Sequence, residues 1–517
     1  SENRTNKHSY NWFSIVKNTT YFVARFSCLS EENLEAYLND RIQKERVQPL
    51  EAAVESGELS VKERDQFVNQ IWQGVQQGLK DAARGPLTRQ IKPRPGAFMP
   101  FPIDSEAPRI GVDLPQLHIC IVSKEFPPFG ASGGIGTLYS HLTGELLILG
   151  HEVTVILPRQ EEGRDDQGRF HIKYVRPDEV GFDGTVPANA ANLSWSLRAA
   201  AAVAEVHQER PVHVVETALW DAEGLAFALI QQGRRPPIVV RLVTPFAVAS
   251  AMNEWDMPPS ATEQFVAAER ALISHADAVI AISESVAATV EKEYQLERDD
   301  RWKISHCGIA YWPFFDVNTG YAEFTGLETI GSQIQKFGKL VLFVGRLERR
   351  KGIDTFLEAV AGILSANSDT CIVIAGKDIE GWTQKSEAII PAKYKKRVIF
   401  AGNVSDLLRE KLMAQADCVV FPSRYESFGL VPLEAFVHGV PVIAADAGAI
   451  PEVVEDGESG LLFPAEDARI LAKTVTRLLQ DRDLRERLSH GAKRASRRFS
   501  GRNAALESIE IYRSVVR

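Results

Sequence analysis

The feature that most constrains the fold is a series of short apolar segments, rich in β-branched residues, with helical sequence between them. In the first half of the chain they lie at 117–122, 151–157, 171–175, 212–216, 237–242, 277–282 and 303–306. In the second half they lie at 340–344, 371–375, 397–401, 418–421, 440–444 and 460–463. Strands that alternate with helices predict α/β domains with parallel sheets covered on both faces. A chain of 517 residues is too long for one such core, so two or three domains are expected.

Charge and cysteine content narrow the classes of partner and compartment. The net charge of −9 argues against nucleic acid or an anionic membrane as the main partner. The five cysteines are odd in number and show no paired spacing, which favours a reduced, cytoplasmic setting. No run of about 18 apolar residues predicts a membrane-spanning helix, and peripheral membrane contact stays open.

Residues 1–107 form an extension with a different composition. The segment 10–26 is aromatic and apolar, and packing on its own helices is favoured over docking on a membrane or partner. Ser60 and Glu63 form a capping box before an apolar stripe of helical period. A Pro/Gly-rich connector follows at 85–102. A mostly helical extension is therefore expected, and no residue in it indicates a chemical role.

The stretch 421–454 points most directly to a site. It begins at the end of an apolar strand, and Pro432 suits the first turn of the helix that follows. The loop before this helix consists of Ser427, Phe428, Gly429 and Leu430. Free N–H groups and the positive end of the helix dipole make such a loop an anion site, and Gly429 lets a ligand approach the backbone.

Two glutamates, Glu426 and Glu434, bracket this loop. A carboxylate is repelled by a bound phosphate, so each is predicted to accept hydrogen bonds from hydroxyl groups of the ligand. A molecule with phosphate in the middle and hydroxyl-rich rings at both ends is a nucleotide sugar. Taken alone, the spacing of the pair favours a chance occurrence in which one carboxylate supports a helix start.

The surrounding pattern is more specific. The sequence Ser-x-x-Glu-x-Phe-Gly-x-x-x-x-Glu-Ala-x-x-x-Gly-x-Pro-Val resembles the Glu-x7-Glu signature of retaining GT-B glycosyltransferases, family 4 in particular. The resemblance covers about residues 115–517 and implies two Rossmann-like domains facing a cleft. It implies an acceptor domain at 108–312, a nucleotide-sugar donor domain at 313–500, and a last helix at 501–517 that returns to the first lobe.

The resemblance also implies roles for single residues. In the pattern Gly-Arg-Leu-x-x-x-Lys-Gly, Arg346 and Lys351 would stabilise the negative charge that develops on a diphosphate leaving group. Glu426 would bind hydroxyls of the donor sugar and complete the catalytic set, and Glu434 would bind the ribose. Arg349 and Arg350 are expected on a solvated surface. The remaining predicted donor contacts are Gly134, Gly345, Val404, Ser427, Phe428, Gly429 and Leu430.

The first half contributes weaker candidates. The turn from Gly133 to Gly136, after the strand 117–122, lacks the third glycine of a dinucleotide fingerprint. It resembles the glycine loop by which family-4 enzymes approach donor phosphate and acceptor, so Gly133 is an acceptor candidate. Glu216 and Trp220 follow the end of a strand, where such sheets bind ligands, and are further acceptor candidates. A capping carboxylate and a half-buried tryptophan explain these two residues equally well.

One departure from the family pattern bears on activity. Val243 stands before Thr244, where the family usually has a histidine close to the donor sugar. This favours the alternative of a non-catalytic GT-B module that binds nucleotide or a partner. A sugar epimerase or phosphorylase of the same architecture is a second alternative, but no acid/base pair or cofactor lysine stands out for either.

The function expected from the resemblance is carbohydrate biosynthesis by retaining transfer of a sugar from a nucleoside-diphosphate sugar to an acceptor hydroxyl. No metal and no cofactor are expected, because the leaving phosphate itself takes the acceptor proton in the mechanism proposed for the family. The motif at 481–483 resembles a metal-binding Asp-x-Asp but is expected on a surface helix. The donor base and sugar, the acceptor, the role of residues 1–107 and the oligomeric state do not follow from the sequence.

Overall fold

The computed structural model describes residues 42–56, 59–83, 116–131, 133–177, 186–310 and 327–516, with six single residues between 13 and 39. The chain divides into two compact units, Ser1–Pro115 with Asp166–His171, and Gln116–Asp165 with Ile172–Arg517. Most of the aromatic segment 10–26, the connector 85–102 and the expected domain boundaries at 107 and 312 lie outside the described residues.

Within Ser1–Pro115, the described residues of the first unit are mostly helical. A π-helical turn, Gln43–Val47, leads into α3 (Gln48–Glu55), and α4 (Val61–Ala83) follows. Ser60 and Glu63 form the predicted capping box, because the N–H of Glu63 donates to Ser60 Oγ at 3.3 Å and the N–H of Ser60 donates to Glu63 Oε2 at 3.0 Å. The helical extension predicted from the sequence is confirmed over these residues.

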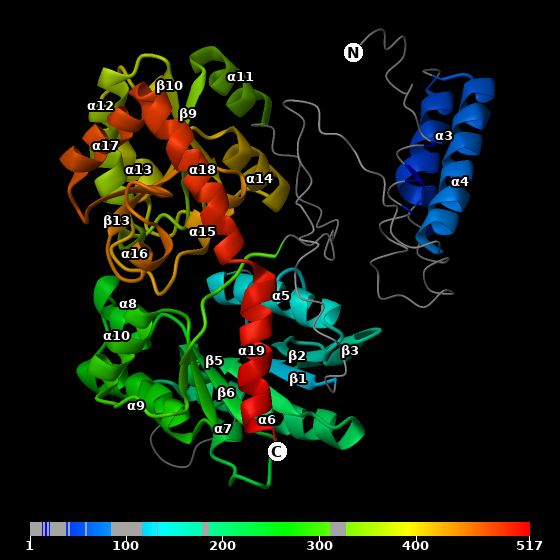
Figure 1. The fold of residues 1–517 in the computed structure, drawn as a ribbon, viewed down its shortest axis with the longest axis vertical. Helices are drawn as coiled ribbons and strands as arrows, with labels where there is room; N and C mark the ends of the chain where they lie inside the picture. Colours follow the sequence, from blue (N-terminus) through cyan, green and yellow to red (C-terminus); the bar gives the residue numbers. More distant parts are fainter. Residues whose placement is uncertain are drawn as a thin grey trace. The chain divides into compact units, whose positions relative to one another are not determined.

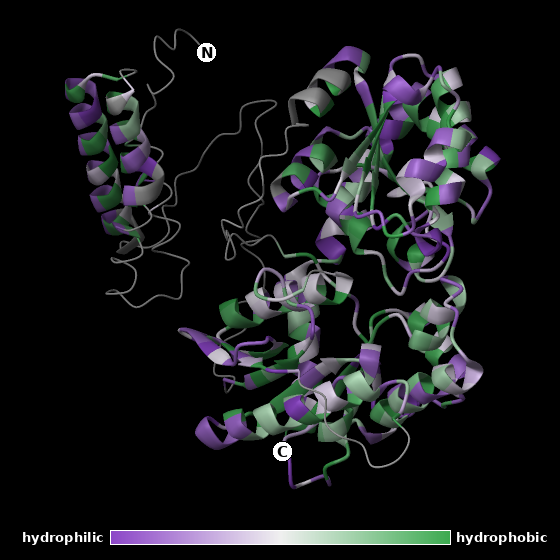
Figure 2. Ribbon diagram, turned by 180° about the vertical axis from the view of Figure 1, so that it is seen from behind, coloured by the Kyte–Doolittle hydropathy of each residue, from purple (hydrophilic) through white to green (hydrophobic). Residues whose placement is uncertain are grey.

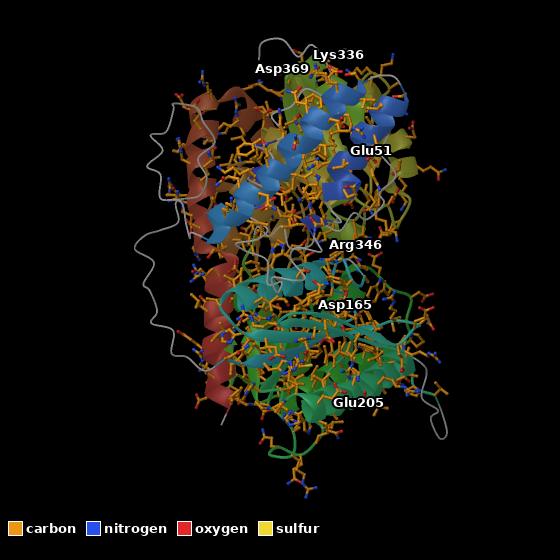
Figure 3. The ribbon with its side chains drawn as sticks, turned by 90° about the vertical axis from the view of Figure 1, so that its right-hand side faces the viewer. Glu51, Asp165, Glu205, Lys336, Arg346 and Asp369 are labelled. Carbon is orange, nitrogen blue, oxygen red and sulfur yellow. The ribbon has the colours of Figure 1, made fainter. Side chains whose placement is uncertain are left out.

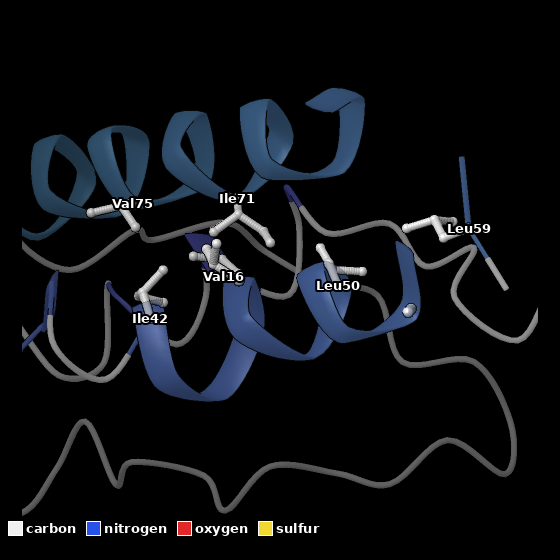
Figure 4. Close-up of a cluster of buried hydrophobic side chains, with 8 residues drawn as sticks. Val16, Ile42, Leu50, Leu59, Ile71 and Val75 are labelled. Atoms are coloured by element: carbon white, nitrogen blue, oxygen red, sulfur yellow. The ribbon is translucent and has the colours of Figure 1, made fainter. Parts of the chain in front are cut away.

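The apolar stripe of α4 faces α3. Ile71 and Val75 point from α4 toward Ile42, Val16 and Leu50 (Figure 4). The buried cluster comprises Val16, Ile42, Val47, Leu50, Ala53, Leu59, Ile71 and Val75. Burying each such side chain stabilises the folded state by about 1.5–3 kcal/mol, so this unit has a small core of its own.

The second unit contains two lobes, each built on a sheet (Figure 1). Over the described residues, the first lobe has eight strands in the order β3-β4-β2-β1-β5-β6-β7-β8. They are β1 (His118–Val122), β2 (Glu152–Pro158), β3 (Gly163–Gln167), β4 (Phe170–Val175), β5 (Val214–Ala218), β6 (Ile238–Leu242), β7 (Ala278–Ala281) and β8 (Trp302–Ile304). Strands β2, β1, β5, β6, β7 and β8 pair in parallel. Strand β3 was not predicted, because its sequence Gly-Arg-Asp-Asp-Gln is polar and mostly exposed.

Helices connect the strands of the first lobe and flank its sheet (Figure 1). They are α5 (Gly134–Ile148), α6 (Ala190–Glu209), α7 (Leu225–Ala228), α8 (Phe246–Met252), α9 (Pro259–His275) and α10 (Glu284–Tyr294). Every residue of β1, β5, β6 and β7 is buried, which is the reason these strands appear as continuous apolar runs in the sequence.

The described strands of the second lobe form a six-stranded parallel sheet in the order β11-β10-β9-β12-β13-β14. They are β9 (Lys339–Val344), β10 (Thr370–Ala375), β11 (Val398–Gly402), β12 (Cys418–Phe421), β13 (Val442–Asp446) and β14 (Gly460–Pro464). The strand order runs outward in both directions from β9 and β12, as in a Rossmann fold. Figure 2 shows these apolar strands inside the lobe, with polar residues on the outer faces of the helices.

From residue 327 onward, the described residues contain nine α-helices. They are α11 (Leu327–Phe337), α12 (Ile353–Ala366), α13 (Trp382–Ile389), α14 (Asp406–Gln415), α15 (Leu430–Val437), α16 (Ile450–Val453), α17 (Ala468–Gln480), α18 (Arg482–Arg498) and α19 (Gly501–Val515). The last of them, α19, packs against α5 of the first lobe (Figure 1). Asp481 caps α18 by accepting from the N–H of Leu484 at 2.9 Å. Two parallel α/β domains and a helical N-terminal region are thus confirmed.

The chain passes between the lobes at two points that lie side by side. The N–H of Ile309 donates to the carbonyl of Phe499 at 3.0 Å, and the N–H of Gly501 donates to the carbonyl of Ile309 at 2.8 Å. A Cβ on Gly308 would lie 2.3 Å from the carbonyl oxygen of Ser500, so this close approach requires glycine. The two crossings therefore form one short hydrogen-bonded ribbon.

Three of the cysteines are buried in strands β1, β10 and β12, as their apolar context predicts. Cys307 is buried as well. None of the described helices combines the length and hydropathy needed to cross a membrane.

Candidate active site

The strand order of the second lobe defines where a ligand binds. In an open parallel sheet, ligands bind outside the carboxyl ends of the strands where the order reverses. Here those strands are β9 and β12. The loop 345–352 follows β9, and the loop 422–429 follows β12. These loops carry the basic pattern and the Glu-x7-Glu pattern, so topology brings the two strongest sequence motifs to one edge of the sheet.

The N-terminus of α15 has the geometry expected of an anion site. Gly429 is the N-cap with φ of 115°, a left-handed conformation that favours glycine, and the helix begins at Leu430. Pro432 lies in the first turn, as predicted. Among the described residues, no backbone carbonyl accepts a hydrogen bond from the N–H of Phe428 or Gly429. These donors are therefore available to a ligand.

Lys351 and Glu426 form a close ion pair beside this helix end. Lys351 Nζ lies 2.5 Å from Glu426 Oε1, and Arg350 Nη1 lies 3.9 Å from Glu426 Oε2. Burial alone would raise the pKa of Glu426, but Lys351 and Arg350 outweigh it and hold the pKa below its usual value. Burial lowers the pKa of Lys351, and Glu426 offsets part of that effect. Glu426 is therefore held as a carboxylate next to two cations.

Arg350 corrects the sequence-based expectation of a solvated residue. Its side chain is buried, with Nη2 2.8 Å from Glu348 Oε1 and Nη1 donating to the carbonyl of Tyr425 at 3.2 Å. Glu348 supplies the buried negative charge that keeps Arg350 inside. The sequence showed only a run of basic residues, and the partner two positions earlier was the signal that could have identified the buried arginine.

Arg346 is brought to the same loop but stays accessible. Its side chain is 56% exposed, and Nη2 lies 3.2 Å from Glu348 Oε1. Figure 3 labels Arg346 at the border between the two lobes of the second unit. Gly345, directly before it, has φ of 155°, and a Cβ on Gly376 would lie 1.8 Å from the Gly345 carbonyl oxygen. Glycine at both strand ends lets the two loops touch and directs Arg346 outward.

Glu434 lies in α15 and pairs with the neighbouring helix α14. It is buried, and its Oε2 lies 3.4 Å from Arg409 Nε of α14. Burial raises the pKa of Glu434, and Arg409 offsets part of the rise. Oε2 accepts no hydrogen bond from the described residues. Val404 lies in the turn between β11 and the same helix α14. Glu434 is thus an acceptor in need of a donor, as the predicted ribose contact requires.

The first lobe contacts the loop before α15 through hydroxyl groups. Ser427 Oγ lies 3.1 Å from Thr244 Oγ1, and the carbonyl of Ser427 accepts from Ser283 Oγ at 2.7 Å. Val243, at the position where the resemblance leads one to expect histidine, is a buried apolar residue. Position 243 therefore offers no polar group to a donor sugar, although its neighbour Thr244 reaches the donor loop.

The glycine loop of the first lobe differs from its expected form. Gly133 is the N-cap of α5, and the N–H of Gly136 donates to Glu125 Oε2 at 3.1 Å. A Cβ on Gly133 would lie 2.3 Å from Glu125 Oε2, whereas a Cβ on Gly134 would meet no atom within 4 Å. A carboxylate of the protein thus fills this helix end, and a phosphate at Gly134 would have to displace it.

The structure corrects the prediction for Glu216. This residue is fully buried, with Oε1 2.6 Å from Arg241 Nε and Oε2 accepting from the hydroxyl of Tyr512. Arg241 also donates to Ser508 Oγ at 3.0 Å. Because Tyr512 and Ser508 belong to α19, the carboxylate attaches the last helix to the sheet, and it is closed to an acceptor.

Trp220 belongs to an aromatic cluster that follows the carboxyl end of β5 in the first sheet. Its ring centroid lies 6.0 Å from Phe246 and 6.3 Å from Trp255, and Trp255 is 41% exposed. The next residue, Asp221, has φ of 63° and is held by Lys124 Nζ at 2.8 Å. Strained, over-determined turns of this kind gather at functional sites. Trp255 and Lys124 lie far from Trp220 along the chain, and no sequence motif links either of them to it.

Two further carboxyl groups lie buried beneath this turn. Burial raises the pKa of Glu223 to about 8, although Lys124 opposes the rise, and Trp195 Nε1 donates to Glu223 Oε2 at 2.9 Å. Burial likewise raises the pKa of Glu269 to about 8, and this residue accepts from the N–H of Phe246 at 3.0 Å. Both groups act as buried hydrogen-bond acceptors, Glu223 for a side chain of α6 and Glu269 for the backbone at the start of α8.

Comparison with known families gives two matches, one for each lobe. Residues 330–495 match the family described as glycosyl transferases group 1. Residues 133–302 match the family described as glycosyl transferase 4-like domain. The glycosyl transferase 4-like match falls in the first lobe, and the group 1 match falls in the second lobe.

Individual proteins with similar sequences are also described as glycosyltransferases. An uncharacterized glycosyltransferase of Methanocaldococcus jannaschii is 30% identical over 237 residues, which are 46% of this chain and 59% of that protein. A D-inositol 3-phosphate glycosyltransferase of a Nocardioides species is 27% identical over 458 residues, which are 83% of this chain and 96% of that protein.

Solved structures agree on the fold. Sucrose-phosphate synthase from Thermosynechococcus elongatus aligns with a TM-score of 0.61 at 21% identity, over 77% of this chain and 99% of that one. The Anabaena protein Alr3699/HepE in complex with UDP and glucose aligns with a TM-score of 0.57 at 20% identity, over 77% of this chain and 100% of that one. The chain therefore belongs to the glycosyltransferases of GT-B architecture and family-4 type.

Proposed function

We propose that this enzyme transfers a sugar from a nucleoside-diphosphate sugar to an acceptor hydroxyl, with retention of anomeric configuration and without a metal ion. The observation that carries the proposal is the ion pair of Lys351 and Glu426, with the exposed Arg346 on the same loop, beside the open N-terminus of α15. Two cations and a set of free N–H groups suit a diphosphate, and the carboxylate suits the hydroxyls of a sugar attached to it.

The transfer step divides among these groups. The bond between the anomeric carbon and the β-phosphate oxygen breaks, and the acceptor oxygen bonds to the same carbon on the same face. The acceptor proton passes to the leaving diphosphate, so no protein base is required. Lys351 and Arg346 stabilise the negative charge that collects on the diphosphate as the bond breaks. Glu426, ionised by its two cationic neighbours, orients the sugar.

The nucleoside binds at Glu434 of α15. Glu434 accepts hydrogen bonds from the ribose, which satisfies its buried Oε2. The turn that contains Val404 contacts the base. The Anabaena neighbour was solved with UDP and with UDP-glucose, which supports a nucleoside diphosphate as the ligand and places UDP first among the candidates to test.

The acceptor binds on the first lobe. The half-exposed Trp255 with Trp220 offers an aromatic surface at the edge that faces the second lobe. Glu254, beside Trp255, pairs with Arg349 of the second lobe at 2.7 Å, which places this surface next to the donor loops.

Thermal unfolding in the presence of UDP, GDP, ADP or TDP, each with and without Mg²⁺, tests the proposal. A ligand at about 100 times its dissociation constant adds about 2.7 kcal/mol to the stability of the folded state. We expect a shift with one nucleotide that Mg²⁺ does not change and that Glu434→Gln reduces. The matched control is Glu358→Gln, which alters an exposed glutamate of α12 in the same lobe.

A non-catalytic GT-B module is the second candidate, and Val243 is the observation that favours it. Such a module would bind the nucleotide and show the same thermal shift. It would neither hydrolyse nor transfer any nucleotide sugar. Incubation of the protein with nucleotide sugars of the base identified by unfolding, followed by NMR of the released sugar, separates the two and reports the anomeric configuration at once.

A further inference from the structure

The N-terminus of α10, in the first lobe, is in direct contact with the donor loop of the second lobe. Ser283 is the N-cap of α10, and its Oγ accepts from the N–H of Val286 at 3.0 Å. The same Oγ donates to the carbonyl of Ser427 at 2.7 Å. Ser283 is fully buried, so water does not compete for either bond. One hydroxyl group thus begins a helix in one lobe and holds the backbone of the donor loop in the other.

A carboxylate of the second lobe occupies the next two N–H groups of the same helix. Glu452 Oε2 accepts from the N–H of Glu284 at 2.9 Å, and Glu452 Oε1 accepts from the N–H of Ser285 at 2.7 Å. Hydrogen bonds from a helix N-terminus to a carboxylate are charge-assisted and among the stronger ones in proteins. Glu452 therefore anchors α16 to the first turn of α10.

The segment that carries Glu452 also holds the backbone of the catalytic glutamate. The N–H of Ala449 donates to the carbonyl of Glu426 at 2.9 Å. A Cβ on Gly448 would lie 2.6 Å from that carbonyl oxygen, so the two segments are in tight contact. Helix α10 thereby restrains the donor loop twice, directly at Ser427 and through the turn 447–452 at Glu426.

We propose that Ser283 and Glu452 are positioning residues of the donor site. They fix the backbone from Glu426 to Leu430 so that its N–H groups and the Glu426 carboxylate meet the diphosphate and the sugar together. Neither residue touches the donor. The inference rests on the proposed function, and it explains how a donor loop can be held from the first lobe when position 243 carries valine.

Hydrogen–deuterium exchange of the unliganded protein tests the restraint without any knowledge of the substrate. In Ser283→Ala we expect the amides of Ala449 and Ile450, which are hydrogen-bonded in the turn that holds the Glu426 carbonyl, to exchange about tenfold faster, because one buried hydrogen bond to the donor loop is lost. Ser283→Thr keeps the hydroxyl and should restore slow exchange. Asp481→Ala removes the N-cap of α18, a comparable capping loss without a contact to the donor loop, and should leave these amides unchanged.

The second readout is binding of the nucleoside diphosphate that stabilises the wild-type protein. We expect its dissociation constant to rise about tenfold in both Ser283→Ala and Glu452→Ala and to return in Ser283→Thr. In turnover, the KM for the donor should rise more than kcat falls. Glu452→Ala keeps the test open if Ser283→Ala does not fold.

Two results would overturn the inference. Exchange at Ala449 and Ile450 that is unchanged in Ser283→Ala would show that α10 does not restrain the loop. Equal effects of Ser283→Ala and Asp481→Ala would show that only helix capping is involved. A wild-type protein that binds no nucleotide contradicts the proposed function instead, and the exchange experiment still decides whether the restraint exists.

Discussion

Two helices of the second unit begin at a glycine after a parallel strand, and their N-termini differ in what occupies them. At α5, the carboxylate of Glu125 fills the helix end and accepts from the N–H of Gly136. At α15, the N–H groups of Phe428 and Gly429 have no backbone partner among the described residues, and Lys351 lies close by. One helix end already carries its anion, and the other is open to a ligand.

A glycine-rich turn before a helix therefore forms an anion site only where no carboxylate of the protein already occupies the helix N-terminus. Both helix ends have the dipole and the free donors that attract negative charge. What separates them is the charged groups beside them, the carboxylate of Glu125 at α5 and the ion pair of Lys351 with Glu426 at α15. Substitutions at the two helix ends and at the buried carboxyl groups therefore test this contrast.

Replacing the cation at α15 should have the largest effect. Lys351→Met keeps the length of the side chain and removes its charge, and we expect turnover of the nucleotide sugar to fall at least about a hundredfold, because charge on the leaving diphosphate loses its stabilisation. Lys385→Met, at an exposed lysine of α13, is the matched control. Turnover within a few-fold of wild type in Lys351→Met would remove the cation from the mechanism and weaken the contrast.

Buried carboxyl groups of the two lobes differ in pKa. The pKa of Glu426 in the second lobe is held below its usual value, whereas burial raises the pKa of Glu223 in the first lobe to about 8. A group whose folded-state pKa is raised contributes stability that is fully present below its unfolded pKa and is lost as the pH rises through 8. We expect the free energy of unfolding to fall between pH 5 and 8. In Glu223→Gln the fall in the free energy of unfolding should be smaller than in the wild type by about 2 kcal/mol.

Urea unfolding at several pH values measures this difference. Glu297→Gln, at an exposed glutamate of the same lobe, should follow the wild-type profile. Identical pH profiles for Glu223→Gln and wild type would mean that Glu223 is ionised in the folded protein.

Removal of the charge at Glu434 should weaken nucleotide binding by about tenfold, because a ribose hydroxyl loses a charged acceptor. Isothermal titration of Glu434→Gln with the stabilising nucleotide measures the loss. The donor-sugar side of the site, at Glu426, should be unaffected, so the catalytic rate at saturating donor should change less than the affinity. An unchanged affinity would place the nucleoside elsewhere.

Neutralising the carboxylate at α5 should have the smallest effect. Glu125→Gln keeps an acceptor for the N–H of Gly136 and removes the negative charge. We expect the nucleotide-induced stabilisation to change by less than about 0.5 kcal/mol, because the diphosphate binds at α15. A large gain in nucleotide affinity would show that the helix end of α5 takes part in phosphate binding, and the contrast between the two helix ends would fail.

The sequence predicts the fold wherever burial sets the pattern of apolar residues in a strand or helix. Strands covered on both faces appear as continuous apolar runs, and all of those predicted are present within a few residues. Strand β3 escaped because its polar residues carry no pattern that separates a strand from a loop. The capping box at Ser60 was predictable because its two partners lie three residues apart.

Site residues could be predicted where a sequence motif lies at the carboxyl end of a strand. They could not be predicted where a partner far along the chain determines whether a side chain is buried. Gly429 and Pro432 identify the start of α15 from local sequence alone. The burial of Glu216 depends on Arg241 and on Tyr512 at the other end of the chain, and the ring of Trp220 packs against Trp255. Contacts across such separations leave no trace in spacing or composition, so single residues of this kind require the structure.

The ribbon formed by Ile309 and Phe499–Gly501 has a mechanical consequence. Two separate tethers between the lobes would allow them to twist and slide independently. Two crossings that are hydrogen-bonded to each other act as a single pivot, so we expect opening and closing of the lobes to follow one rotation, with Gly308 at its axis. A side chain at position 308 would meet the Ser500 carbonyl and force that pivot apart, although it lies outside every loop that binds substrate.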